Sequence, residues 1–150
     1  MNDWQAIADV VAKLAYTQDS RDWDGLRAQF AERVLLDLST HFGDDPVEFT
    51  PAELADKART VLQGFDCTHH SPAGLLTEVT GDTATCRAYV TAYHHVPAPP
   101  GVVDYCIMRG FWSVRLVRTD EGWRVREWAV ERTAPWEGSE DVYRLAAERS

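Results

Sequence analysis

The spacing of hydrophobic residues changes along this chain, and the change separates a helical part from a part made of strands. Near the N-terminus, apolar residues recur every three or four positions, which is typical of amphipathic helices. From residue 75 onward, apolar residues mostly alternate with polar ones, which is typical of strands with one buried face. The pattern therefore predicts helices first and then a run of strands joined by short turns.

Three helices are predicted in the first part of the chain. The first covers residues 2–18, and Asp22 is placed to cap a short second helix. The third has the clearest start, because Thr50 can cap it, Pro51 suits the first helical position and Glu53 completes a capping box. We expect these helices to pack on one face of a sheet.

The strands account for most of the remaining chain. Their order, after the helices and with short turns between them, predicts an α+β fold with a curved sheet of antiparallel strands. No linker, internal repeat or low-complexity segment interrupts the chain, so a single domain over residues 1–150 is expected. Strands are predicted over residues 33–39, 75–80, 83–96, 105–118 and 123–132, followed by a short helix from Ser139.

The long strand predicted over residues 83–96 has two different faces, because side chains of a strand alternate. One face is small and apolar and the other is aromatic and polar, so the second either lies at the surface or lines a cavity. The apolar face carries Ala88, Val90, Ala92 and His94, and the polar face carries Tyr89, Thr91, Tyr93 and His95. In the last strand the same alternation places Trp123, Val125 and Ala129 on one face.

Composition and charge narrow the class of protein. The net charge of −9 argues against binding to nucleic acid or to an anionic membrane surface. No apolar run is long enough to span a bilayer, and the N-terminus does not resemble a signal peptide. Three cysteines without metal-ligand spacing favour a reducing, cytoplasmic location. Six tryptophans and five tyrosines can fill a core or wall a pocket for a flat or apolar ligand.

Candidate chemistry rests on two histidine pairs, His69-His70 and His94-His95. Neighbours in an extended segment point in opposite directions, so one histidine of each pair can face a shared interior. Imidazole transfers protons near neutral pH, and a carboxylate can hold its tautomer; Asp19 is best placed for that role. Alternatively, the histidines lie at the surface and Asp19 only caps a turn. A zinc site lacks the usual spacing, and no metal site is predicted.

Five short motifs follow one another along the chain. They are DSRDWDGL at residues 19–26, THH at 68–70, GDTA at 81–84, AYHH at 92–95 and GWR at 122–124. In this order they resemble the SnoaL-like branch of the NTF2-like superfamily, and within it the scytalone dehydratases. The resemblance covers nearly the whole chain. It implies a cone-shaped fold, in which a curved antiparallel or mixed sheet carries N-terminal helices and the open end holds a small molecule.

The resemblance also implies roles for individual residues. Asp19, His70 and His95 would be catalytic, with Asp19 hydrogen-bonded to His95 and both histidines moving protons to and from the substrate. Two tyrosines that position substrate in the dehydratases are replaced, because Gln18 precedes the aspartate and Leu38 stands in the first strand.

Other residues are expected to take over substrate binding. Tyr16, Tyr93 and Tyr105 are the candidates to replace the two tyrosines, and Trp112 lies nearest to the position of a pocket asparagine in the family. Together with Leu38, these are the expected substrate-binding residues. Members of the family typically need no metal or organic cofactor and commonly pair through the sheet, which implies a homodimer.

These observations predict a small lyase or isomerase of the dehydratase or cyclase type. It would abstract a proton next to a carbonyl group of a small, aromatic or polyketide-like compound. Two alternatives stay open, because one fold can host several functions. The cone could hold an apolar ligand without catalysis, or it could serve as a small subunit of a larger enzyme. Titratable groups that converge inside the cavity would favour the enzyme.

Overall fold

The computed structural model describes residues 2–150, and its first three helices begin where the sequence predicts. Asn2 and Asp22 cap α1 and α2, each by accepting a hydrogen bond from a backbone N–H. At α3, the side chains of Thr50 and Glu53 form the predicted capping box. The helices are α1 (Asp3–Asp19), α2 (Trp23–Arg27), α3 (Pro51–Leu62) and α4 (Val142–Ala147).

Seven strands form one mixed sheet. The long strands β3 to β6 are antiparallel neighbours, whereas β1 pairs with β6 in parallel. The sheet order is β2-β1-β6-β5-β4-β3, and β7 pairs with β5. Two short strands were not predicted, and β3 begins well before residue 75. The strands are β1 (Phe30–Asp37), β2 (Val47–Phe49), β3 (Cys67–Thr80), β4 (Thr83–His95), β5 (Tyr105–Thr119), β6 (Gly122–Arg132) and β7 (Glu137–Gly138).

Two irregularities in strand register decide which side chains face the helices. The pairing of β3 with β4 shifts at Gly74, whose φ of 61° is accessible to glycine at little cost. In β6, Arg126 is an extra residue that has no partner on β5. A bulge reverses the alternation beyond it. The prediction that Ala129 faces inward is therefore wrong, and Trp128 is buried in its place.

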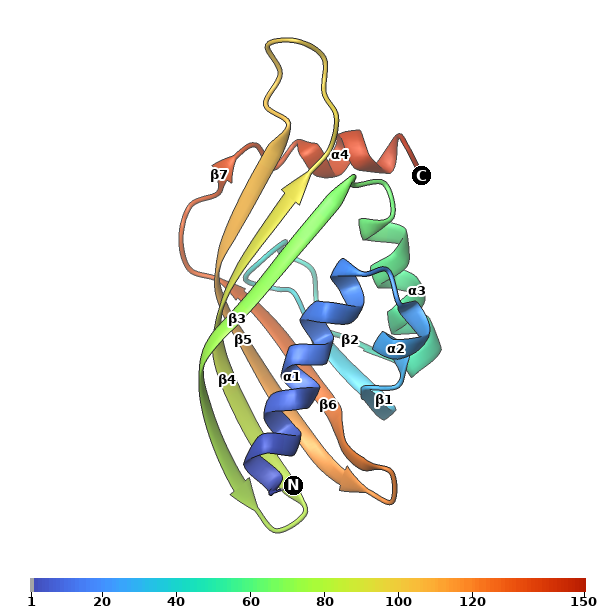
Figure 1. Cartoon of the computed structure of the whole chain (residues 1–150), viewed down its shortest axis with the longest axis vertical. Helices are drawn as coiled ribbons and strands as arrows, with labels where there is room; N and C mark the ends of the chain where they lie inside the picture. Colours follow the sequence, from blue (N-terminus) through green and yellow to red (C-terminus); the bar gives the residue numbers. More distant parts are fainter. Residues whose placement is uncertain (1) are drawn as a thin grey trace.

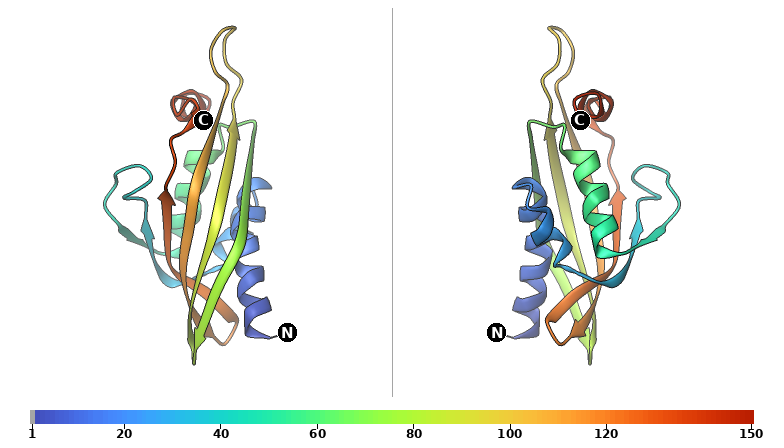
Figure 2. Two further views of the ribbon diagram at one scale, coloured as in Figure 1. Left: turned by 90° about the vertical axis from the view of Figure 1, so that its left-hand side faces the viewer. Right: turned by 90° about the vertical axis from the view of Figure 1, so that its right-hand side faces the viewer.

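The helices lie inside the bend of the sheet, which confirms the expected α+β fold with a curved sheet. The right-hand view of Figure 2 looks onto α1, α2 and α3 with the strands behind them. Figure 1 shows α4 at the end of the sheet from which the loop between β4 and β5 projects. Within residues 2–150, no helix is both long and apolar enough to cross a membrane.

Two hydrophobic clusters hold these layers together. The larger one joins α1, through side chains such as Ile7 and Leu14, to the inner face of the sheet. The smaller one fixes α4 to the end of the sheet. It consists of Leu62, Phe65, Val96, Cys106, Val142 and Ala146. Burial of this apolar surface drives packing, so α4 is an integral layer of the fold.

Candidate active site

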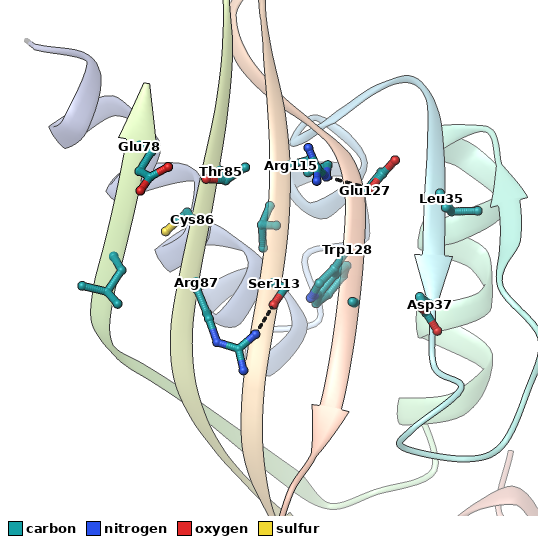
Figure 3. Close-up of a pocket in the computed structure, with 13 residues that line it drawn as sticks. Leu35, Asp37, Glu78, Thr85, Cys86, Arg87, Ser113, Arg115, Glu127 and Trp128 are labelled. Carbon is teal, nitrogen blue, oxygen red and sulfur yellow. Dashed lines mark hydrogen bonds and ion pairs between the residues drawn. The ribbon is translucent and has the colours of Figure 1, made fainter. Parts of the chain in front are cut away.

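Two hollows of similar size lie on opposite faces of the sheet. The inner cavity, of about 430 Å³, is open on one side and is lined by the sheet, α3, α4 and the loop after β1. The outer groove, of about 410 Å³, crosses the strands on the face turned away from the helices (Figure 3). In the outer groove Arg115 pairs with Glu127 at 3.2 Å, and Arg87 donates to Ser113 at 2.8 Å. The inner cavity is the candidate site, because three histidines, His41, His70 and His94, converge on it, whereas the outer groove contains no histidine.

Asp19 and His70 form a hydrogen-bonded pair beside the inner cavity. The carboxylate of Asp19 lies 2.7 Å from Nδ1 of His70, and it accepts hydrogen bonds from the His70 backbone N–H at 2.8 Å and from the Thr68 hydroxyl at 3.0 Å. Burial alone would raise the pKa of Asp19, but the hydrogen bonds from His70 outweigh it and hold this pKa below its ordinary value. Because an ionised carboxylate can only accept, Nδ1 of His70 carries a proton.

The other ring nitrogen of His70 is available to a ligand. His70 lines the inner cavity. In residues 2–150, the hydrogen bonds of its ring all involve Nδ1, and none reaches Nε2. A neutral His70 with a proton on Nδ1 therefore has a free lone pair on Nε2, as a general base requires. Asp19 does not cap the turn after α1: within residues 2–150 its carboxylate accepts hydrogen bonds from Thr68 and His70 only, and it fixes this tautomer.

The expected hydrogen bond between Asp19 and His95 is wrong. Nδ1 of His95 lies 3.0 Å from the carbonyl oxygen of Asp104, on the face of β4 that points away from the helices. Its neighbour His94 points the other way, is 3% exposed and lines the inner cavity. Side chains alternate along β4, so His94 shares the buried face with Ala92. The two histidine pairs are thereby split between the faces, and residues 2–150 hold no metal-binding cluster.

His94 contacts Tyr143, a residue of α4. The hydroxyl oxygen of Tyr143 lies 3.0 Å from Nε2 of His94, and the rings of His94 and His70 are 5.7 Å apart. Burial, with smaller contributions from His70 and His41, lowers the pKa of His94 to about 3. Burial, with a smaller contribution from the charge of Arg132, lowers the pKa of His41 to about 4. Both histidines are therefore neutral at pH 7.

The remaining walls of the inner cavity are mainly apolar and aromatic. Trp112 and Leu38, both predicted to bind substrate, line it. Trp112 is 2% exposed, and its ring lies 6.0 Å from that of His70. Trp128 meets Trp112 edge to face at 5.3 Å. Gln18 also lines the cavity, with its amide donating to the carbonyl of Leu14 at 2.8 Å. Walls of this kind suit a flat, apolar ring.

The three tyrosines expected to bind substrate lie outside the inner cavity. Tyr16 is 75% exposed on α1. Tyr93 and Tyr105 are stacked neighbours on the outward-facing side of β4 and β5, with ring centroids 6.4 Å apart. The same alternation that buries His94 turns both of these tyrosines away from the helices. The expectation that these tyrosines bind substrate is therefore not supported by their position.

Most residues of the inner cavity were not among the predicted site residues, and four of them bear on its chemistry: His41, His94, Trp128 and Tyr143. The apolar neighbours of His94 in the strand were a usable signal that it faces inward. The other three carry no local signal. His41 reaches the cavity from the loop after β1, Trp128 because of the bulge in β6, and Tyr143 through the packing of α4.

A bent mixed sheet with helices inside its bend and a cavity between them is the architecture of NTF2-like proteins. The profile of the SnoaL-like domain matches residues 1–129. The chain belongs to the SnoaL-like domain family. A comparison with curated protein sequences finds no match.

Solved structures of the same fold are similar over most of the chain. The protein Kfla4162 from Kribbella flavida is 24% identical, with a TM-score of 0.86 and 96% of each chain covered. A proposed scytalone dehydratase from Novosphingobium aromaticivorans is 18% identical, with a TM-score of 0.72 and coverage of 91% of this chain and 87% of that one. A type 2 hexachlorocyclohexane dehydrochlorinase is 18% identical, with a TM-score of 0.75 and coverage of 90% and 87%.

Proposed function

We propose that this protein is a lyase or isomerase that uses the Asp19–His70 pair as a general base on a small, neutral carbonyl compound. The observation that carries this proposal is the hydrogen bond of 2.7 Å between Asp19 and Nδ1 of His70, which leaves Nε2 of His70 free beside the inner cavity. This arrangement has the geometry that general-base catalysis needs.

In the proposed reaction, Nε2 of His70 removes a proton from the carbon next to the carbonyl group. The carboxylate of Asp19 stabilises the imidazolium that forms, because the proton on Nδ1 already points at it. The resulting enolate either takes the proton back at another carbon, which is an isomerisation, or expels a leaving group, which is an elimination. In the second case the leaving group receives a proton from His70 or from water.

The part of the cavity around His70 supports a neutral substrate. His41 and His94 are uncharged at pH 7, and the neighbouring walls are the rings of Trp112 and Trp128, whereas the charged lining residues Asp44 and Lys57 belong to the loop after β1 and to α3. Burying a charged ligand without a partner would be costly. The names scytalone dehydratase and hexachlorocyclohexane dehydrochlorinase both describe eliminations, which is consistent with a base at this wall. A binding module without catalysis is less favoured, because it would not need an oriented imidazole.

Exchange of hydrogen for deuterium tests the proposed base without knowledge of the natural substrate. The protein is incubated in deuterium oxide with a panel of cyclic and ring-fused ketones, and incorporation next to the carbonyl is followed by mass spectrometry. We expect the wild-type protein to accelerate exchange, and the Asp19→Asn and His70→Gln variants to lose most of this activity. If no ketone of the panel exchanges faster than in buffer, or if both variants match the wild type, the proposal is wrong.

A further inference from the structure

A hydroxyl group from the C-terminal helix enters the cavity that holds the proposed base. Tyr143 lines the inner cavity, and its oxygen lies 3.0 Å from Nε2 of His94. The profile of the family ends at residue 129, so α4 and this hydroxyl lie beyond the matched region. The reaction proposed above does not use either side chain. The direction of their hydrogen bond decides what Tyr143 can do.

The surroundings of His94 favour a proton on Nε2. Nδ1 of His94 is buried and has no hydrogen-bond partner among residues 2–150. A proton on Nδ1 would leave a buried N–H donor unsatisfied, which folded proteins rarely tolerate. The backbone of Ala92 lies near enough to raise the pKa of His94 slightly, as an acceptor would, but it does not have the distance and angle of a hydrogen bond to Nδ1. A proton on Nε2 is accepted by the phenol oxygen of Tyr143.

If Nε2–H of His94 donates to the oxygen of Tyr143, the hydroxyl hydrogen of Tyr143 stays free to donate to another group. Among residues 2–150, the hydroxyl of Tyr143 makes a hydrogen bond only with His94, so its hydrogen has no other protein acceptor. We propose that Tyr143 donates a hydrogen bond to an oxygen atom of the bound substrate, and that His94 is the positioning residue that directs this hydroxyl. This inference rests on the proposed function and adds an oxygen-binding group to the cavity that holds the base.

The ring of Tyr143 is held firmly, so its hydroxyl has a defined position. Phe65 and Phe42 meet the ring edge to face, with centroids 5.2 Å and 5.3 Å away. The flanking residue Val142 is fully buried, and α4 packs so closely on Gly64 that a side chain would not fit there. A donor fixed before the substrate arrives needs little reorganisation during the reaction.

The donor would act where charge develops. When Nε2 of His70 takes the proton from carbon, the electron pair of the broken C–H bond moves into the enolate and negative charge gathers on the carbonyl oxygen. A hydrogen bond from Tyr143 stabilises that oxygen, and the N–H of His94 strengthens the phenol as a donor. Burial holds the pKa of Tyr143 well above its ordinary value, so the phenol donates a hydrogen bond and keeps its proton.

The tautomer of His94 can be measured without any ligand. Nitrogen-15 labelling of histidine and two-bond proton–nitrogen correlation spectra separate the two neutral tautomers, and single histidine substitutions assign the signals. At pH 7 we expect His94 to carry its proton on Nε2. In Tyr143→Phe, which keeps the ring but removes the acceptor, we expect its Nε2 signals to shift. The matched Tyr16→Phe variant should leave them unchanged. A proton on Nδ1 in the wild-type protein would overturn the proposal.

Ligand binding gives the second test. The probes are 1-tetralone, a ring-fused ketone, and tetralin, which has the same fused rings but no oxygen. The wild type should bind the ketone about fivefold more tightly than tetralin, the effect of one neutral hydrogen bond. Tyr143→Phe should abolish this preference and leave tetralin binding unchanged, whereas a purely structural role would weaken both probes equally. A preference that survives in Tyr143→Phe, or no binding of 1-tetralone, would contradict the proposal.

The two proposals fail in different ways. If Asp19→Asn exchanges ketone hydrogens as fast as the wild type while the preference for 1-tetralone depends on Tyr143, the proposed base is wrong and the oxygen-binding group stands. If exchange depends on Asp19 and the preference is the same in Tyr143→Phe, the base stands and the role of Tyr143 is wrong.

Discussion

Replacing Asp19 by asparagine should reverse the tautomer of His70. The carboxylate accepts hydrogen bonds from the backbone N–H of His70 and from Nδ1 of the same residue, one on each oxygen. Asparagine offers one oxygen and one NH₂ group. The backbone N–H can only donate, so the amide oxygen must accept from it and the NH₂ group then faces Nδ1. Nδ1 becomes the acceptor, the ring proton moves to Nε2, and the free lone pair beside the cavity is lost.

These contacts set the expected loss of exchange rate and the expected loss of stability in Asp19→Asn. Losing an oriented general base lowers a rate by about 10²–10⁴-fold, which is the expected loss of ketone exchange in Asp19→Asn. Hydrogen bonds to a charged group stabilise by about 2 kcal/mol. In a chain of 150 residues this corresponds to a decrease in Tm of about 6 °C.

The pH dependence of the stability effect has a defined sign. The pKa of Asp19 is lowered by folding, so its contribution is complete above the ordinary value of 3.8 and is lost as the pH falls through the folded value. The difference in Tm between wild type and Asp19→Asn should therefore be largest near pH 7 and should shrink below pH 3.8. Thermal unfolding at several pH values measures this directly.

Asp37→Asn is the matched control. The carboxylate of Asp37 also accepts two hydrogen bonds, from the backbone N–H and the hydroxyl of Ser39 at 2.9 Å and 2.6 Å, but it borders the outer groove. This variant should exchange ketone hydrogens at the wild-type rate. The reasoning is refuted if Asp19→Asn keeps exchange within twofold of the wild type, or if Asp37→Asn loses as much.

Three further predictions concern other parts of the molecule. His95→Ala should leave ketone exchange unchanged and alter the free energy of unfolding by at most about 0.5 kcal/mol, measured by urea titration. His41 and His94, with pKa values of about 4 and about 3, bind protons more readily when unfolded, so Tm should fall as the pH drops below 6.5, and less steeply in His94→Gln. The chain should sediment as a homodimer paired through the outer sheet face, and Tyr89→Glu on that face should give monomers.

The helices and strands were predictable because their signals are local. Capping at Thr50 and the alternation along β4 depend on a few neighbouring residues, and the structure matches both. Asp19 was correctly expected to lie near a histidine, from its position at the end of the first helix and from the family resemblance. The partner of Asp19 was predicted wrongly, since it depends on pairing between strands rather than on any single segment.

The register of the β3–β4 hairpin explains why His94, and not the predicted His95, lies beside His70. Next to the turn, Thr80 pairs with Thr83, and continuing that register would place His70 opposite Tyr93 and on the same face as His95. The bulge at Gly74 shifts the pairing by one residue, so His70 lies opposite Ala92 instead. On an antiparallel pair, opposite residues share a face, so the shift turns His70 to the buried face of β4 that carries Ala92 and His94. His95 lies on the other face of β4. A glycine inside a strand is a recognised sign of a bulge, so Gly74 was the one local clue. The acid–base geometry of the cavity is thus set by a residue that contacts neither Asp19 nor a substrate, because one slip in register exchanges every side chain between the two faces of the sheet.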